Sequence, residues 1–286
     1  MMKSSNIKSL IMISLLLFLS LATSILAQEV EDESEFNYIE GDKKGPENWG
    51  NIKEEWATCN TGQLQSPIDL LPWIVQPVPY PQEISRSYFH GLAKLKNRGH
   101  DIKLEWLNGK SKIRLNGTEY VLLNCHWHSP SEHAINGKRY PLEGHFVHQG
   151  PDNSIAVIGF LYDLGQPDPF LSSVEAELRE ISSNNTNEII VGLVNPLAVQ
   201  KPGNMYYRYM GSLTTPACNE GVIWTVETKI GTVSNEQLEL LRDAVHDDAR
   251  YNARPLQPIN GRRVHLYKAR HWFKQLISTL FEELLY

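Results

Sequence analysis

A long stretch of alternating residues that carries two histidines constrains the fold more than any other part of the chain. In residues 118–128 apolar and polar side chains alternate. This predicts a β-strand, because successive side chains of a strand point to opposite faces. His126 and His128 are therefore expected on one face. An Asn-Gly turn at residues 136–137 predicts a neighbouring antiparallel strand, which brings His145 beside them.

Three neutral imidazoles with a fourth position left open are the ligands of a catalytic zinc ion. His126, His128 and His145 are therefore candidate ligands for Zn²⁺. A His-x-His pair alone carries little weight, since surface strands contain such pairs by chance. The third histidine is what favours a metal site.

The rest of the pattern is rich in strands. Strand-like runs occupy residues 101–106, 154–162, 206–211 and 222–226. Helices are predicted for about residues 170–181 and after Ser234, which forms a capping-box pattern with Gln237. The chain is expected to be mostly β, a single domain with a few short helices.

Four segments are predicted. Residues 1–27 resemble a cleaved signal peptide, with an uncleaved membrane anchor as the alternative. Residues 28–44 are acidic and expected to be a mobile tail, and residues 45–270 form the domain. Residues 271–286 form an amphipathic helical extension that is too short to span a bilayer. That helix could fold onto the domain, join two copies in a homo-oligomer, or contact a membrane surface.

Secretion sets expectations for the cysteines and asparagines. Two of the three cysteines are expected to pair in an oxidising compartment. Cys125 lies within the histidine strand and is interpreted as a buried free thiol, which leaves a Cys59–Cys218 disulfide. Asn116 and Asn184 begin glycosylation sequons.

The charge pattern does not indicate a nucleic-acid partner. The formal net charge is −6, and removing residues 1–27 removes two lysines and no acids, so it becomes −8. No basic patch with interleaved aromatic residues occurs.

Six short motifs occur in order along the chain, and together they resemble those of the α-class carbonic anhydrases. They are Ser66-Pro67-Ile68-Asp69, Asn97-Arg98-Gly99-His100, His126-Trp127-His128 with Ser131-Glu132-His133, Leu142-Glu143-Gly144-His145, Gly211-Ser212-Leu213-Thr214-Thr215-Pro216 and Asn252-Ala253-Arg254-Pro255. The segment from Cys125 to His133 resembles the plant branch of this class. The resemblance covers about residues 45–270 and implies one domain built around a large, twisted, mainly antiparallel sheet.

The resemblance also implies roles for individual residues. The three histidines would hold zinc, Glu143 would orient His145, and Asn124 stands where a glutamine usually supports the first ligand. Glu132 would accept a hydrogen bond from Thr214 beside the metal, and His100 would be the proton shuttle. The substrate-binding wall would consist of Val147, Val157, Leu213, Thr214, Thr215, Val222 and Trp224. The family's disulfide, where present, matches Cys59 and Cys218.

The implied activity is the reversible hydration of carbon dioxide to bicarbonate and a proton by hydroxide on zinc. The alternative is a non-catalytic storage or binding protein on the same fold, although such relatives typically lack a zinc histidine. Arg98, Lys103 and Gly144 depart from the family pattern. The signal predicts entry to the secretory route, with the apoplast, the vacuole or the plastid as destinations.

Overall fold

The computed structural model describes residues 33–79, 84–184, 187–199, 203–245 and 249–268. The predicted signal peptide and the predicted C-terminal helix lie outside these residues. Among the helices of the described part, none has the length and apolar character to cross a membrane.

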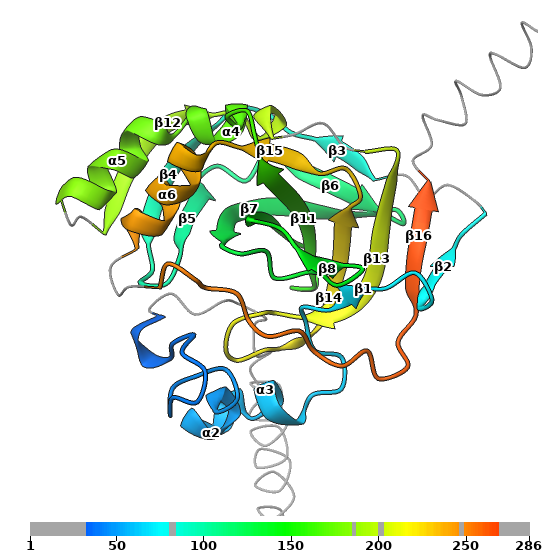
Figure 1. Cartoon of the computed structure of the whole chain (residues 1–286). Helices are drawn as coiled ribbons and strands as arrows, with labels where there is room; N and C mark the ends of the chain where they lie inside the picture. The colour runs from blue at the N-terminus through cyan, green and yellow to red at the C-terminus, as the bar shows by residue number, and fades with distance from the viewer. Residues whose placement is uncertain (1–32, 80–83, 185–186, 200–202, 246–248, 269–286) are drawn as a thin grey trace, which may run out of the picture.

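Strands dominate the described part of the chain, as the sequence predicts (Figure 1). Their bounds are β1 Asp69–Leu70, β2 Val75–Pro77, β3 Ser85–Ser87, β4 Gly91–Asn97, β5 Ile102–Trp106, β6 Lys112–Leu115, β7 Thr118–His128, β8 Ala134–Ile135, β9 Lys138–Arg139, β10 Leu142–Gln149, β11 Ile155–Leu164, β12 Glu188–Val194, β13 Met205–Ser212, β14 Glu220–Glu227, β15 Gly231–Val233 and β16 Val264–Lys268.

Thirteen of these strands form one large sheet in the order β12-β4-β5-β7-β10-β11-β14-β13-β16-β2, with β3, β6 and β15 off this path. The sheet is mainly antiparallel. Its parallel pairs are β11 with β14, β11 with β15, and β16 with β2. A separate small sheet joins β1, β8 and β9. The predicted fold class is confirmed.

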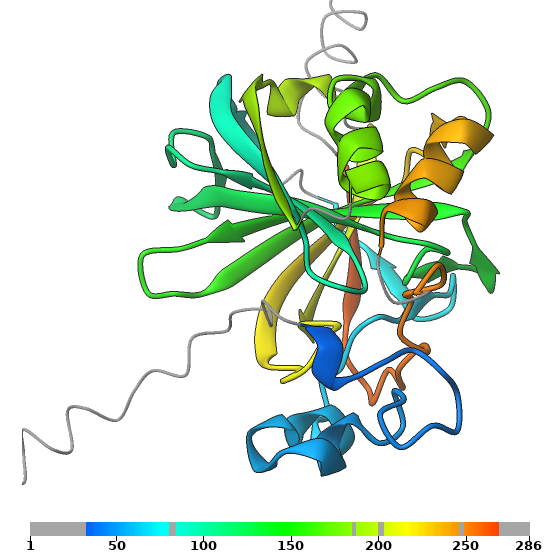
Figure 2. The same cartoon turned by 90° about the vertical axis from the view of Figure 1, so that its left-hand side faces the viewer.

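The helices are short and lie at two ends of the molecule. Their bounds are η1 Glu33–Glu35, α2 Trp49–Ile52, η2 Glu54–Trp56, α3 Thr58–Thr61, α4 Pro169–Ser172, α5 Glu175–Asn184, η3 Pro196–Ala198 and α6 Asn235–Ala244. Figure 2 shows α4, α5 and α6 at the end opposite to α2 and α3. The capping box predicted before α6 is present, with Ser234 and Gln237 each bonding the other's backbone.

The single helix predicted for residues 170–181 is in fact two. Asp168 caps α4 by accepting a hydrogen bond from the Leu171 amide. The amides of Ser173 and Val174 then bond carbonyls three residues back. This tightened turn ends α4, and α5 begins at Glu175.

The central sheet separates two apolar clusters. The alternation of β7 places Cys125 and Trp127 in the cluster that also holds Phe146 and the residues of α4 to α6. Val147 and Trp224 belong to the cluster on the opposite face. β10 and β11 are buried along nearly their whole length, as expected for central strands covered on both sides. The histidines of β7 and β10 therefore lie in the middle of the domain.

The prediction of a mobile tail is corrected for residues 33–44. Phe36 is 1% exposed and packs with Trp49 and Trp56. Glu33 is also buried, with Oε1 3.8 Å from Nη2 of Arg98. The aromatic side chain and the paired charge hold this acidic segment against the domain.

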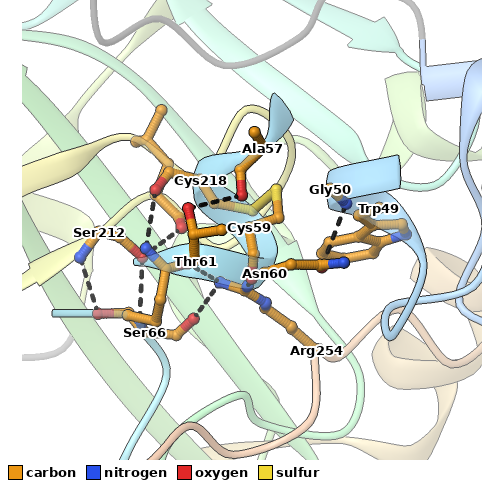
Figure 3. Close-up of a disulfide and its surroundings, with 12 residues drawn as sticks. Trp49, Gly50, Ala57, Cys59, Asn60, Thr61, Ser66, Ser212, Cys218 and Arg254 are labelled. Carbon is orange, nitrogen blue, oxygen red and sulfur yellow. Dashed lines mark hydrogen bonds between the residues drawn. A yellow bond between two sulfur atoms is a disulfide. The ribbon is translucent and has the colours of Figure 1, made fainter. Parts of the chain in front are cut away.

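The predicted disulfide between Cys59 and Cys218 is present, and Cys125 is a buried free thiol. Figure 3 shows that the disulfide lies beside Arg254, whose guanidinium donates to the carbonyls of Cys59 and Ser66. The disulfide therefore ties α3 to the loop that follows β13.

Candidate metal centre

Three histidine ring nitrogens converge in the buried centre of the sheet. β7 and β10 are paired so that His145 lies opposite His126, which brings the three predicted ligands together. Nδ1 of His145 is 3.3 Å from Nε2 of His126. Nε2 of His128 completes a group whose ligand atoms all lie within 4.8 Å of one another. The exposed fraction of each of the three residues is at most 2%.

Hydrogen bonds on the far side of each ring fix its tautomer. His128 donates from Nδ1 to the Asn252 carbonyl over 2.8 Å, and His126 donates from Nδ1 to Asn124 Oδ1 over 3.2 Å. His145 donates from Nε2 to Glu143 Oε1 over 2.9 Å. Because all three acceptors are oxygens without hydrogens, the remaining ring nitrogens carry lone pairs. These lone pairs face one another.

This arrangement fits zinc. Ligands held about 2.05 Å from a tetrahedral ion lie roughly 3.3 Å apart, which matches the distance between His126 and His145. Nε2 of His128 is buried and has no hydrogen-bond partner in the described part of the chain, as expected for an atom that binds a metal ion. His126, His128 and His145 would therefore hold the ion.

The surroundings act differently on the pKa of His126 and of His128. Burial, followed by the charge of Arg98, holds the pKa of His126 well below its usual range. Burial also lowers the pKa of His128, but Glu132 and the Asn252 carbonyl more than offset it and raise that pKa overall. A metal ion would compete with a proton at this ring.

Glu143 connects His145 to a hydrogen-bond network with His133 and Tyr209. Its carboxylate accepts from His145, from Nδ1 of His133 over 2.7 Å and from the His133 amide over 2.8 Å. Burial alone would raise the pKa of Glu143, but His133 and His145 hold it well below its usual range. Nε2 of His133 accepts from the Tyr209 hydroxyl at 2.7 Å. Both ring nitrogens of His133 are thus occupied, so it supports the site and is not placed to bind the ion.

Glu132 lies beside the histidines, but its predicted hydrogen bond with Thr214 is not formed in the structure. Oε1 accepts from the Arg254 amide over 2.9 Å. Oε2 is buried without a hydrogen-bond partner, 3.6 Å from Nε2 of His128 and 4.0 Å from Nδ1 of His145. A carboxylate oxygen next to the ring nitrogens of His128 and His145 is a second reason to expect a cation here.

The residues predicted for the apolar wall lie on the same face of the sheet as the histidines. Val147, Val157, Leu213, Val222 and Trp224 all belong to one buried cluster. The Trp224 ring lies 4.8 Å from that of His145. Thr214 and Thr215 follow Leu213, are both buried, and Thr215 Oγ1 has no hydrogen-bond partner.

His100 is held by the N-terminal segment. It is 3% exposed, and its ring packs against those of Phe36 and Tyr38, with centroids 4.9 and 5.6 Å away. Its Nε2 contacts the Phe36 carbonyl, and its amide donates to Glu33. The predicted shuttle is therefore covered by residues that the sequence assigned to a mobile tail.

Sequence reasoning missed the roles of Asn252 and Arg254. Asn252 binds His128 through its carbonyl, while its side chain bonds the Ser129 amide and the carbonyls of Trp127 and His100. Arg254 positions Glu132 through its amide. The Asn-Ala-Arg-Pro motif was the signal in the sequence, but nothing in it points to residues more than 120 positions earlier.

The match to a family model decides the family of the chain. The model of the eukaryotic-type carbonic anhydrases matches residues 44–268. This chain belongs to the carbonic anhydrase family.

Carbonic anhydrases and dioscorins are both among its relatives. Alpha carbonic anhydrase 7 of Arabidopsis thaliana is 50% identical over 240 residues, which cover 84% of this chain and 87% of the relative. Dioscorin DB3S of Dioscorea polystachya is 45% identical over 279 residues, 98% of this chain and 99% of the relative. The crystal structure of a dioscorin complexed with ascorbate matches with a TM-score of 0.80 and 44% identity, covering 82% of this chain and 98% of that one.

Three departures from the carbonic anhydrase pattern are accommodated by their surroundings. Asn124, although shorter than glutamine, still reaches His126. A Cβ added to Gly144 would lie 3.3 Å from the Trp127 ring, so glycine allows this close approach. Arg98 donates to both carboxylate oxygens of Asp101, which offsets its charge near His100.

Proposed function

We propose that this chain is a zinc-dependent carbonic anhydrase that interconverts carbon dioxide and bicarbonate. The observation that carries the proposal is the set of three buried imidazoles with converging lone pairs and tautomers fixed by Asn124, Asn252 and Glu143. In carbonic anhydrases, zinc is known to lower the pKa of its bound water to about 7.

The chain's own residues would then bind and orient the reactants. Carbon dioxide is uncharged and apolar, so the cluster of Val147, Val157 and Trp224 suits it without any binding charge. Thr214 and Glu132 would orient the attacking oxygen once the Thr214 hydroxyl donates to Glu132. The proton released by each turnover would leave through His100, since an imidazole titrates close to neutral pH.

A metal analysis paired with a hydration assay tests the proposal. The purified protein should hold one zinc per chain and lose its activity when a chelator removes the metal. His128→Ala should lose both zinc and activity, whereas replacing the exposed His90 in the same way should change neither. Full activity in the metal-stripped protein would overturn the mechanism.

A second candidate is a non-catalytic storage or binding protein. It is favoured by the similarity to dioscorins, which extends over 98% of this chain. One zinc per chain with no hydration activity would support this candidate against the first.

We propose secretory delivery of the chain. The disulfide between Cys59 and Cys218 supports it, because such bonds persist in oxidising compartments. Asn116 is exposed at the turn between β6 and β7, where a glycan would be accommodated. Loss of mass on glycosidase treatment tests occupancy of both sequons.

Comparing the mass in solution of the full chain with one ending at residue 268 tests whether the C-terminal segment joins two copies.

A further inference from the structure

A cavity lies on the face of β13 and β16 opposite to the metal centre. Its volume is about 350 Å³, within the range of small-molecule sites. Tyr209 points toward the metal centre, where it bonds His133. Because neighbouring side chains of a strand alternate, Arg208 and Met210 point to the other face and line this cavity. Tyr209 also borders it, and the Arg262 guanidinium lies 5.6 Å from the centroid of the Tyr209 ring.

Among the described residues, three arginines line the cavity and no aspartate or glutamate does. They are Arg208, Arg262 and Arg263, joined by His265, which lies directly opposite Arg208 on β16. None of the three arginines has a described carboxylate oxygen within 4.0 Å, although Arg262 is held by backbone carbonyls. The lining therefore carries several cations and no carboxylate among the described residues, and Glu227 and Glu220 act on Arg208 and Arg262 only from beyond 4.0 Å.

Arg208 is the most constrained of the three. The residue is 9% exposed, and its guanidinium lies over the rings of Tyr206 and Tyr267, 5.2 and 5.9 Å from their centroids. Nε donates to Thr225 Oγ1 over 2.9 Å, but Nη2 is buried without a hydrogen-bond partner among the described residues. Burial lowers the pKa of this arginine. A buried unpaired guanidinium nitrogen is costly, so its presence beside a cavity indicates a ligand that supplies the acceptor.

The other lining residues indicate the polarity of the rest of the ligand. Met210 and Ile223 pair across β13 and β14, and Tyr267 adds an aromatic edge. We propose that this cavity binds a small organic oxyanion, with a carboxylate or phosphate head on Arg208 and an apolar body against Met210, Ile223 and Tyr267. The planar fork of arginine suits both kinds of head group. The cavity contains none of the proposed zinc ligands, although Tyr209 borders it and also bonds His133.

Titration calorimetry on the zinc-loaded chain tests this proposal. Asn116 lines the cavity and begins a sequon, so the protein carries Thr118→Ala, which removes the sequon and keeps Asn116. Benzoate, phenyl phosphate and inorganic phosphate are compared at constant ionic strength. We expect saturable binding of at least one aromatic anion, tighter than that of inorganic phosphate, which lacks an apolar body. The tighter of benzoate and phenyl phosphate identifies the head group.

Variants locate the binding. Arg208→Gln should weaken it about tenfold to a hundredfold, as expected for the loss of a charge-assisted hydrogen bond. Arg263→Ala changes an exposed residue, so it should fold normally and still weaken binding several-fold. Arg179→Ala removes an equal charge from the exposed face of α5 and should change binding less than twofold. A metal ion also attracts anions, so His128→Ala is included to remove the proposed zinc site. Binding of the anion to the cavity should be unchanged in this variant.

Three results would overturn the proposal. The first is the absence of saturation with both aromatic anions. The second is unchanged binding in Arg263→Ala and in folded Arg208→Gln. The third is loss of binding in His128→Ala, which would assign the anion to the metal centre.

Discussion

The backbone oxygen of Asn252 accepts a 2.8 Å hydrogen bond from Nδ1 of His128, a residue 124 positions earlier in the chain. The side chain of Asn252 bonds the Ser129 amide and the carbonyls of Trp127 and His100. One residue therefore fixes the orientation of a proposed zinc ligand and the backbone of the proposed proton shuttle.

Replacing Asn252 by alanine should weaken zinc binding although Asn252 is not a ligand. The variant loses three buried side-chain hydrogen bonds, so its carbonyl no longer holds a fixed position beside His128. We expect zinc affinity to fall about tenfold to a hundredfold, as for other residues that support metal ligands. Competition with a chromogenic chelator measures it. Gln257→Ala, which removes a side chain bonded only to the Pro255 carbonyl, is the control. Equal affinity in both variants would contradict the role assigned to Asn252.

Replacing His100 by alanine should slow turnover when buffer is scarce. Without the imidazole, proton release should become limiting, with a loss of about tenfold or more. Imidazole added to the solution should restore part of the rate. Carbon dioxide hydration at low and high buffer concentrations measures the effect. If the rate of His100→Ala does not depend on buffer, the covered His100 is not the shuttle.

Asp168 should make stability depend on pH. Burial raises the pKa of this carboxyl from 3.8 to about 6 in the folded protein. The folded state therefore holds the proton more tightly than the unfolded state. The resulting stabilisation is fully present below pH 3.8 and is lost as the pH rises through about 6. The difference amounts to about 3 kcal/mol at most.

Asp168→Asn keeps the cap of α4, because asparagine is an equally good capping residue. The difference in unfolding free energy between the original protein and this variant should fall between pH 4 and pH 6.5. Denaturant titrations at several pH values measure that difference, in which the other titrating groups cancel. A difference that stays constant over this range would show that Asp168 does not titrate as described.

Removing the disulfide should affect both stability and activity. It closes a loop of 159 residues, and losing such a constraint costs about 5 kcal/mol when the unfolded chain is free. The Cys218 amide also donates to the Thr215 carbonyl, so the loop carrying Thr214 should loosen. The double variant Cys59→Ser, Cys218→Ser should unfold at a lower temperature and turn over more slowly. Cys125→Ala tests whether loss of any thiol has the same effect. Unchanged activity in the double variant would separate the disulfide from the site.

The parts of the fold that could be predicted from the sequence are those set by local pattern. Alternation located β7 at residues 118–128 and separated the two histidines from Trp127. Buried interactions between distant segments could not be predicted in this way. The sequence around Glu33 predicts a solvated acidic segment. Its burial could not be predicted, because its partner Arg98 is 65 positions away. The break between α4 and α5 was missed because Val174 continues the apolar spacing of a single helix.

The alternation of β13 has a consequence for engineering. Tyr209 contacts the network beneath the proposed zinc site, and Arg208, its neighbour in sequence, faces the cavity on the far side. β13 thus lies between the cavity and the hydrogen-bond network of the proposed zinc site, and Tyr209 contacts both. Substitutions at positions 208 and 210 change the cavity and leave Tyr209 in place, so they should leave catalysis intact. Ligand binding at the cavity could therefore be altered without changing the proposed zinc site.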